Sequence, residues 1–190
     1  MTTTATIPAI LGGAPAVTLD QTRANQWPII TEQDEEAVLD VLRSGNLSLH
    51  PIVGKLEEDY KQLTGRKFAL THNNGTSAIL AGLHAIGIQP FDEVIVPSAT
   101  WWSSVMPVLH CGGVPVFAEL EPKCLGLNPE DIERKITDKT KAIVVVHLFG
   151  MPSKMDEIVE IAKKHNLKIL EDASHAHGAT YKGKPIGSFG

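Results

Sequence analysis

The chain has 190 residues, of which 43% are hydrophobic and 21% charged, as expected of a single soluble domain with a sizeable core. Its 22 acidic and 17 basic residues give a net charge of −5, which argues against nucleic-acid binding or a polybasic membrane-binding role. No apolar run reaches the roughly 20 residues of a membrane helix, and no signal peptide is evident. We therefore expect a cytoplasmic protein whose two cysteines, Cys111 and Cys124, are free thiols.

The first third of the chain predicts an arm followed by two helices. Residues 1–30 show no periodicity and contain three prolines, so we expect an N-terminal arm. Thr31 is a good N-cap for a helix over residues 32–42, and Gly45 follows its end. Apolar positions at helical spacing predict a second helix over residues 51–63.

From Lys67 onward, short apolar runs alternate with helical patterns. Strands are predicted over residues 67–71, 93–97, 114–119, 141–149 and 167–172. Helical patterns lie between them, over residues 75–87, 101–112, 128–136 and 153–166. This alternation predicts an α/β fold of three layers, with a mainly parallel sheet between two layers of helices. In such sheets ligands bind beyond the carboxyl ends of the strands, so the residues that follow each strand are the candidates for a functional site.

The first two strand ends carry a helix start and a pair of tryptophans. The turn around Gly75 leads into a helix that begins with Thr76 and Ser77, and a helix N-terminus of this kind can bind a phosphate. An ordinary capped turn would have the same sequence, and the lysine of a P-loop is absent. Trp101 and Trp102 offer a flat face for an aromatic ring, or simply pack at a core or interface.

The last two strand ends carry histidines and carboxylates. His147 follows a strand as a single histidine, and such a residue is more often packed and hydrogen-bonded in the fold than used to bind a ligand. Asp172 could pair with a ring nitrogen and keep it protonated, as in pyridoxal-phosphate enzymes. A metal site at Asp172, His175 and His177 is an alternative, but no HExxH or CxxC framework supports it, and we assign no metal. A phosphate-binding helix N-terminus, a flat aromatic face and a carboxylate together predict a site for a phosphorylated aromatic cofactor.

Four stretches of the chain resemble one enzyme family. They are SGNLSLHPIVGKLEEDYKQLTG (44–65), NNGTSAILAGLHAIGI (73–88), DEVIVPSATWWSSV (92–105) and EDASHAHGATYKGKPIGSFG (171–190). In this order they are similar to the DegT/DnrJ-type aminotransferases, which aminate keto sugars and aminocyclitol precursors. The resemblance implies pyridoxal 5'-phosphate as cofactor, the fold type I architecture, and a homodimer with active sites at the subunit interface.

The resemblance also implies roles for individual residues. Gly75, Thr76 and Ser77 would bind the cofactor phosphate, and Trp101 would stack on the pyridine ring. Asp172 would pair with the pyridine nitrogen as the catalytic carboxylate. His175 stands where the family has Gln or His near the phenolic oxygen of the cofactor.

The Schiff-base lysine of the family would lie after Gly190. Lys182 and Lys184 fall in a polar turn, and the other lysines fall on helix faces or at strand starts, so none is placed for that role. We therefore expect residues 31–190 to form the N-terminal part of the large domain, without the C-terminal small domain. We also expect the isolated chain to be inactive. The lysine would be supplied either by the continuation of a longer protein of which this chain is a segment, or by a separate chain that carries the C-terminal half.

The expected reaction moves an amino group from glutamate or glutamine to a keto sugar or cyclitol ketone. Two alternatives stay open at this point. One is a non-catalytic relative that binds cofactor or sugar and regulates or scaffolds a partner. The other is a lysine-free relative that uses pyridoxamine phosphate to dehydrate a sugar.

Overall fold

The computed structural model describes residues 7–18, 20, 22, 26–48 and 50–190. Its internal contacts divide the chain into two units, residues 1–50 and residues 51–190. The first unit contains a short 3-10 helix, η1 (Ala9–Leu11), and the helix α1 (Glu32–Ser44). Part of the predicted arm, residues 1–6, 19, 21 and 23–25, lies outside the described residues.

Helix α1 begins at Glu32, as the sequence predicted, and ends at Ser44, two residues later than predicted. The Thr31 side chain accepts a hydrogen bond from the backbone N–H of Asp34, and the Asp34 carboxylate accepts one from the backbone N–H of Thr31. This reciprocal capping box satisfies donors that the first helical turn would otherwise leave unpaired. Gly45 ends the helix with a φ of 67°, a left-handed conformation that glycine adopts without strain.

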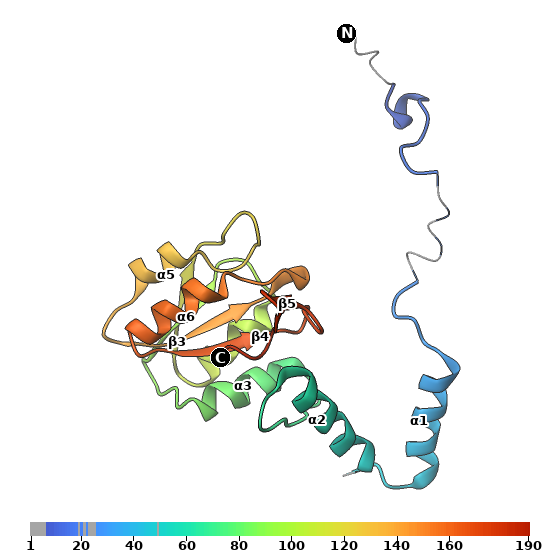
Figure 1. Ribbon diagram of the computed structural model, residues 1–190, viewed down its shortest axis with the longest axis horizontal. Coiled ribbons are helices and arrows are strands. Elements are labelled where there is room, and N and C mark those ends of the chain that lie inside the picture. Colours follow the sequence, from blue (N-terminus) through green and yellow to red (C-terminus); the bar gives the residue numbers. More distant parts are fainter. Residues whose placement is uncertain (1–6, 19, 21, 23–25, 49) are drawn as a thin grey trace. The chain divides into compact units, whose positions relative to one another are not determined.

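The second unit contains a parallel sheet of four strands (Figure 1). The strands are β1 (Glu93–Pro97), β2 (Val114–Ala118), β3 (Thr140–Val146) and β4 (Lys168–Asp172). They pair in the order β2-β1-β3-β4, and every pair is parallel. A small antiparallel hairpin, β5 (Thr180–Tyr181) and β6 (Lys184–Pro185), follows the sheet. The parallel sheet and four of the five predicted strands are thus confirmed.

Helices flank this sheet. The longer helices of this unit are α2 (Pro51–Thr64), α3 (Gly75–Ala85) and α6 (Met155–Lys164), of which α3 and α6 contact β4. Two shorter helices, α4 (Met106–His110) and α5 (Pro129–Lys135), and two 3-10 turns, η2 (Trp102–Ser104) and η3 (Leu148–Gly150), complete the unit. Over the described part of the chain, no helix has both the length and the apolar character that a membrane crossing would require.

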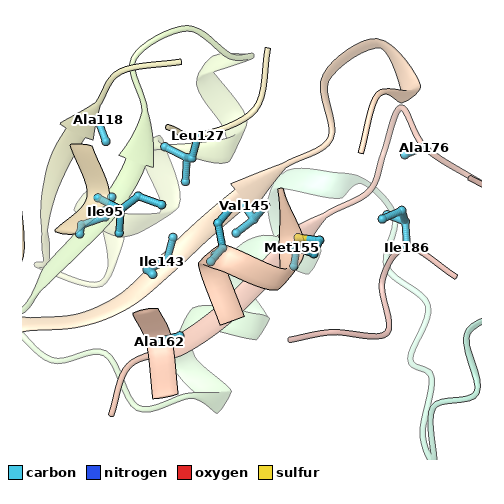
Figure 2. Close-up of a cluster of buried hydrophobic side chains, with 11 residues drawn as sticks. Ile95, Ala118, Leu127, Ile143, Val145, Met155, Ala162, Ala176 and Ile186 are labelled. Carbon is cyan, nitrogen blue, oxygen red and sulfur yellow. The ribbon is translucent and has the colours of Figure 1, made fainter. Parts of the chain in front are cut away.

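Strand alternation divides the core between the two faces of the sheet. Ile95 and Val145 pack with Ile158 of α6 in one buried cluster, which also includes residues of α5 (Figure 2). Their neighbours Val96 and Val144 belong to a second cluster, with residues of α3 and α4. Because successive side chains of a strand point to opposite faces, helices cover both sides of the sheet, and the predicted three-layer α/β class is confirmed.

The predicted strand over residues 67–71 is wrong for this chain. Phe68 and Leu70 are 78% and 75% exposed, and no described strand pairs with this segment. The backbone N–H and the hydroxyl of Thr71 instead donate to the carboxylate of Glu57, at 2.9 and 3.0 Å. An apolar run forms a strand only where a partner supplies the ladder hydrogen bonds, and local sequence does not report that partner.

Candidate active site

A cavity of about 670 Å³ lies at the carboxyl ends of the strands, within the second unit. Its wall includes residues that follow β1, β3 and β4, together with the first turn of α3. Five of the six residues proposed from sequence line it, namely Gly75, Thr76, Trp101, Asp172 and His175. The fold therefore brings together side chains that lie almost 100 residues apart in the sequence, at the edge where parallel sheets bind ligands.

The first turn of α3 presents free backbone donors to this cavity. Asn74 caps the helix, and its side-chain oxygen accepts a hydrogen bond of 2.8 Å from the N–H of Ser77. The N–H groups of Gly75 and Thr76 have no partner among the described residues, as expected for the start of a helix. Ser77 does not line the cavity. The helix dipole and the donors of Gly75 and Thr76 suit an anion.

The two tryptophans after β1 have different positions. Trp101 lines the cavity and is 66% exposed, so its ring face is free to stack. Trp102 begins η2, is 58% exposed, and is not part of the cavity wall. Only the first of the pair is therefore placed to contact a ligand in this cavity.

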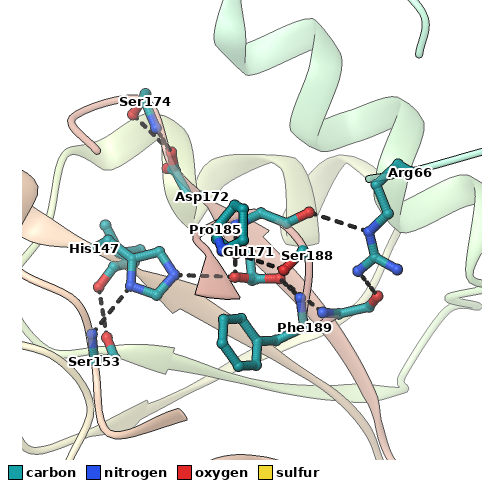
Figure 3. A network of polar contacts seen from close by, with 12 residues as sticks. Arg66, His147, Ser153, Glu171, Asp172, Ser174, Pro185, Ser188 and Phe189 are labelled. Atoms are coloured by element: carbon teal, nitrogen blue, oxygen red, sulfur yellow. Dashed lines mark hydrogen bonds and ion pairs between the residues drawn. The ribbon is translucent and has the colours of Figure 1, made fainter. Parts of the chain in front are cut away.

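The carboxylate of Asp172 is buried and hydrogen-bonded on the cavity wall, with 8% of the residue exposed. Its Oδ1 accepts hydrogen bonds from the backbone N–H of Ser174, at 3.1 Å, and from the Ser174 hydroxyl, at 2.6 Å (Figure 3). Its Oδ2 accepts one of 2.7 Å from the hydroxyl of Ser104. Three donors therefore fix the orientation of this carboxylate.

His175 follows β4 and lines the same cavity. Its Nδ1 accepts a hydrogen bond of 3.3 Å from the backbone N–H of Phe149, and the two rings stack with centroids 6.0 Å apart. Because Nδ1 accepts, the neutral ring carries its proton on Nε2. Phe149 has a φ of 54°, an uncommon left-handed conformation for a residue that is not glycine. The structure thus leaves His175 with a ring N–H to donate.

His147 is packed and hydrogen-bonded, as its position suggested, and it is completely buried. Its Nδ1 accepts a hydrogen bond of 3.1 Å from the backbone N–H of Ser153. Nε2 therefore carries the proton and donates to the carboxylate of Glu171 at 3.3 Å (Figure 3). His147 thus ties the loop after β3 to the end of β4.

Glu171 also holds the last four residues of the chain. Its carboxylate accepts hydrogen bonds from the N–H groups of Gly187, Phe189 and Gly190, at 2.9, 2.6 and 2.7 Å. Burial by itself would raise the pKa of Glu171, but the His147 N–H and these three backbone donors hold that pKa below its usual value. On the other side, the Arg66 guanidinium donates to the carbonyl oxygens of Gly187 and Gly190 (Figure 3).

The sequence reasoning assigned no role to Ser104, Ser174 or the Glu171 network. The spacing of Asp172 and Ser174 is typical of a local side-chain turn and could have been predicted. Ser104 lies 68 residues from Asp172, so no local signal indicated their contact. As for the metal alternative, no group of three or more possible ligands comes together in the part of the chain that the structure describes.

This architecture, a mainly parallel sheet with the site at its carboxyl edge, is that of the fold type I pyridoxal-phosphate-dependent transferases. The chain superposes on the aminotransferase from Psychrobacter cryohalolentis with a TM-score of 0.84 and 40% identity, over 87% of this chain and 42% of that one. It superposes on NtdA from Bacillus subtilis with bound cofactor PMP with a TM-score of 0.76 and 35% identity, over 83% of this chain and 37% of that one.

The model of the DegT/DnrJ/EryC1/StrS aminotransferase family matches residues 28–190, and the chain belongs to this family. It is 44% identical to the GDP-perosamine synthase of Caulobacter vibrioides, over 75% of this chain and 38% of that protein. It is 37% identical to the L-glutamine:2-deoxy-scyllo-inosose aminotransferase of Streptomyces lividus, over 85% of this chain and 40% of that protein. The chain thus spans about two fifths of the length of these relatives.

Proposed function

We propose that this chain is part of a pyridoxal-phosphate-dependent aminotransferase that transfers an amino group from an amino acid to the ketone of a sugar or cyclitol. The cavity at the carboxyl ends of the strands carries this proposal. A helix N-terminus at Gly75 and Thr76, an exposed ring face at Trp101 and the buried carboxylate of Asp172 meet there. These groups suit the phosphate, the ring and the ring nitrogen of one small molecule.

The residues present fit this cofactor. The free N–H groups of Gly75 and Thr76 would hold its phosphate, and Ser77, whose N–H is occupied by Asn74, would add only its hydroxyl. Trp101 would stack on the pyridine ring. Asp172 would accept a hydrogen bond from the protonated ring nitrogen. The Nε2–H of His175 would donate toward the phenolic oxygen, since its Nδ1 is occupied by Phe149.

Pyridoxal phosphate, when bound, supplies an electron sink for negative charge that develops on the substrate carbon. Three groups of side chains in this protein would support that capacity to take up negative charge. Asp172 would hold a proton on the ring nitrogen, because a carboxylate next to it favours the charged form. Trp101 would cover one face of the ring and exclude water from it. Ser104 and Ser174 would keep the Asp172 carboxylate in place.

The substrate class follows from the relatives. The name of the Streptomyces lividus relative specifies L-glutamine and 2-deoxy-scyllo-inosose, and that of the Caulobacter vibrioides relative specifies GDP-perosamine. We therefore propose glutamate or glutamine as amino donor and a keto sugar or a cyclitol ketone as acceptor. The acceptor would reach the exposed side of the cavity, next to Trp101 and His175.

In this proposal residues 31–190 form the N-terminal part of the large domain, the arm over residues 1–30 precedes it, and two subunits associate. The Schiff-base lysine would come from a part of the protein outside these residues. No lysine is among the residues that line the cavity. The ammonium of Lys182 is paired with Asp156, which raises the pKa of that lysine and makes it a poor nucleophile. Lys184 lies over the ring of Phe189, at 4.1 Å.

The test uses the protein expressed from its complete gene and loaded with pyridoxal phosphate. Addition of glutamate or glutamine should convert the cofactor to pyridoxamine phosphate and release the matching keto acid, as read by absorbance and product analysis. A keto sugar or cyclitol ketone should then restore pyridoxal phosphate and yield an amine. Failure to bind the cofactor, or bound cofactor that no amino acid converts, would overturn the proposal. The latter outcome would favour the regulatory alternative, and a deoxygenated sugar product would favour the dehydratase.

A further inference from the structure

A relay of hydroxyl groups leads to the Asp172 carboxylate. Ser104, at the end of η2, is 1% exposed, and its hydroxyl donates to Oδ2 of Asp172 at 2.7 Å. The hydroxyl oxygens of Thr100 and Ser104 lie 3.2 Å apart. A serine hydroxyl has a single proton, and Ser104 gives it to Asp172, so Thr100 must be the donor of the other bond. Donation by Thr100 polarises the Ser104 hydroxyl and strengthens its bond to the carboxylate.

The two oxygens of Asp172 are not equally available. A carboxylate has about four acceptor positions, roughly two on each oxygen. Both positions on Oδ1 are used by the N–H and the hydroxyl of Ser174 (Figure 3). Oδ2 accepts only the Ser104 hydroxyl among the described residues. One acceptor position therefore remains, and it is on Oδ2.

We propose that Ser104 is a positioning residue that aims this remaining acceptor position at the ring nitrogen of the cofactor, an inference that rests on the proposed function. Both hydrogen-bond partners of Ser104, Thr100 and Asp172, line the cavity, and so does Ser104 itself. Among the described residues, the Ser104 hydroxyl hydrogen-bonds only with these two cavity-lining side chains. Without Ser104, the Oδ2 of Asp172 would lose the contact that fixes its direction.

The test measures how strongly the protein prefers a ligand with a ring nitrogen. The protein from the complete gene, freed of cofactor, is titrated with pyridoxamine 5'-phosphate and with its 1-deaza analogue, in which a C–H replaces the ring nitrogen. Neither ligand needs a covalent bond to the protein, and tryptophan fluorescence reports binding. The preference is the Kd of the deaza analogue divided by the Kd of pyridoxamine phosphate.

Wild-type protein should show a clear preference, and Ser104→Ala should lower it about tenfold by weakening only the binding of pyridoxamine phosphate. Ser104→Thr, which retains a hydroxyl, should restore it. Thr100→Val should lower it less, because the bond from Ser104 to Asp172 remains. The matched control is Thr137→Val, which removes a hydroxyl-to-carboxylate bond to Glu93 at the amino ends of the strands and should leave the preference unchanged.

An unchanged preference in Ser104→Ala would overturn the inference, and so would an equal weakening of both ligands, which would mean a change in cavity shape. If Ser104→Ala fails to fold, as judged by circular dichroism, Thr100→Val decides: an unchanged preference there overturns the relay. A wild-type protein that does not distinguish the two ligands would instead contradict the pairing of Asp172 with the ring nitrogen. That result concerns the proposed function, so the two failures are distinguishable.

Discussion

Glu171 and Asp172 are adjacent carboxylates at the end of β4, and their surroundings differ in kind. The Glu171 carboxylate accepts hydrogen bonds from the His147 ring and from three backbone N–H groups of residues 187–190, four donors in all. The Asp172 carboxylate accepts three, all from serines, and retains an acceptor position on a cavity wall. Strand alternation sends the two side chains to opposite faces of the sheet.

The difference separates an anchor from a ligand-binding group. A buried carboxylate whose acceptor positions are filled by protein donors has no capacity left for a ligand, so Glu171 is suited to hold the loops beside it. Asp172 keeps one free acceptor position on the cavity wall, where a positively charged ring nitrogen could donate a hydrogen bond to it. Burial is common to both residues, so the number of protein donors, rather than burial, indicates which of the two serves the proposed chemistry.

The largest expected effect is that of Asp172→Asn on turnover. An amide cannot keep the ring nitrogen protonated as a carboxylate does, so turnover of the complete enzyme should fall by two orders of magnitude or more, about 3 kcal/mol of transition-state stabilisation. Steady-state kinetics of the amino transfer would measure the loss. Urea unfolding of the same variant serves as control and should change by less than about 1 kcal/mol. Near-wild-type turnover would mean that Asp172 is not the carboxylate that pairs with the cofactor.

Glu171→Ala should show the opposite pattern, a loss of stability. Removing the carboxylate leaves the His147 N–H and three backbone N–H groups without their acceptor, and an unsatisfied buried donor is costly. We expect the free energy of unfolding in urea to fall by about 3 kcal/mol. Glu171→Gln, which keeps one side-chain oxygen, should lose less. A loss below about 1 kcal/mol in both variants would contradict the assignment of Glu171 as an anchor.

The sheet that carries the two carboxylates, and the position of the cavity at its edge, could be predicted from the sequence. The alternation of apolar runs and helical patterns predicted the parallel sheet, because its central strands, β1 and β3, are apolar runs buried on both faces. Residues at or shortly after the carboxyl ends of strands, such as Asp172 and Trp101, could be predicted at the cavity because topology alone places them at one edge.

The rest depended on contacts between distant residues. Ser104 meets Asp172, and Arg66 meets residues 187–190, only after the chain has folded, so no local pattern reports these pairs. The wrong prediction of a strand over residues 67–71 has the same cause, because the segment has a strand-like composition but no described strand pairs with it. The adjacent letters E and D in the sequence likewise gave no indication that one carboxylate is saturated and the other is not.

Asp131 tests whether a buried, hydrogen-bonded carboxylate that does not line the cavity acts as an anchor elsewhere in the fold. It is 2% exposed, and it accepts hydrogen bonds from the backbone N–H of Glu119 and from the side chain of Arg134, both at 2.7 Å. The Glu119 N–H is the main cause that lowers the pKa of Asp131 from 3.8 to about 2. The bond from Glu119 ties α5 to the residue that follows β2, and Asp131 is not among the residues that line the cavity.

A lowered folded-state pKa means that the charged form of Asp131 stabilises the fold above pH 4 and that this contribution is lost as the pH falls toward 2. We expect Asp131→Asn to reduce the free energy of unfolding by about 2 kcal/mol at neutral pH, with a difference from wild type that vanishes near pH 2. Urea unfolding at a series of pH values would measure it. A difference that is independent of pH would show that lost packing, rather than lost charge, is the cause.

The smallest expected effect concerns another adjacent pair, Trp101 and Trp102 after β1. Both are more than half exposed, but only Trp101 lines the cavity, so the pair repeats the comparison of two neighbours with different surroundings. Trp101→Ala should weaken the binding of pyridoxamine phosphate about fivefold, because a stacked aromatic pair contributes about 1 kcal/mol. Trp102→Ala, the matched control, should leave that Kd within about twofold of wild type. Equilibrium dialysis suits this measurement, since both substitutions alter the fluorescence signal. Equal weakening by the two substitutions would mean that they act through the loop they share, and that Trp101 does not stack on the ring.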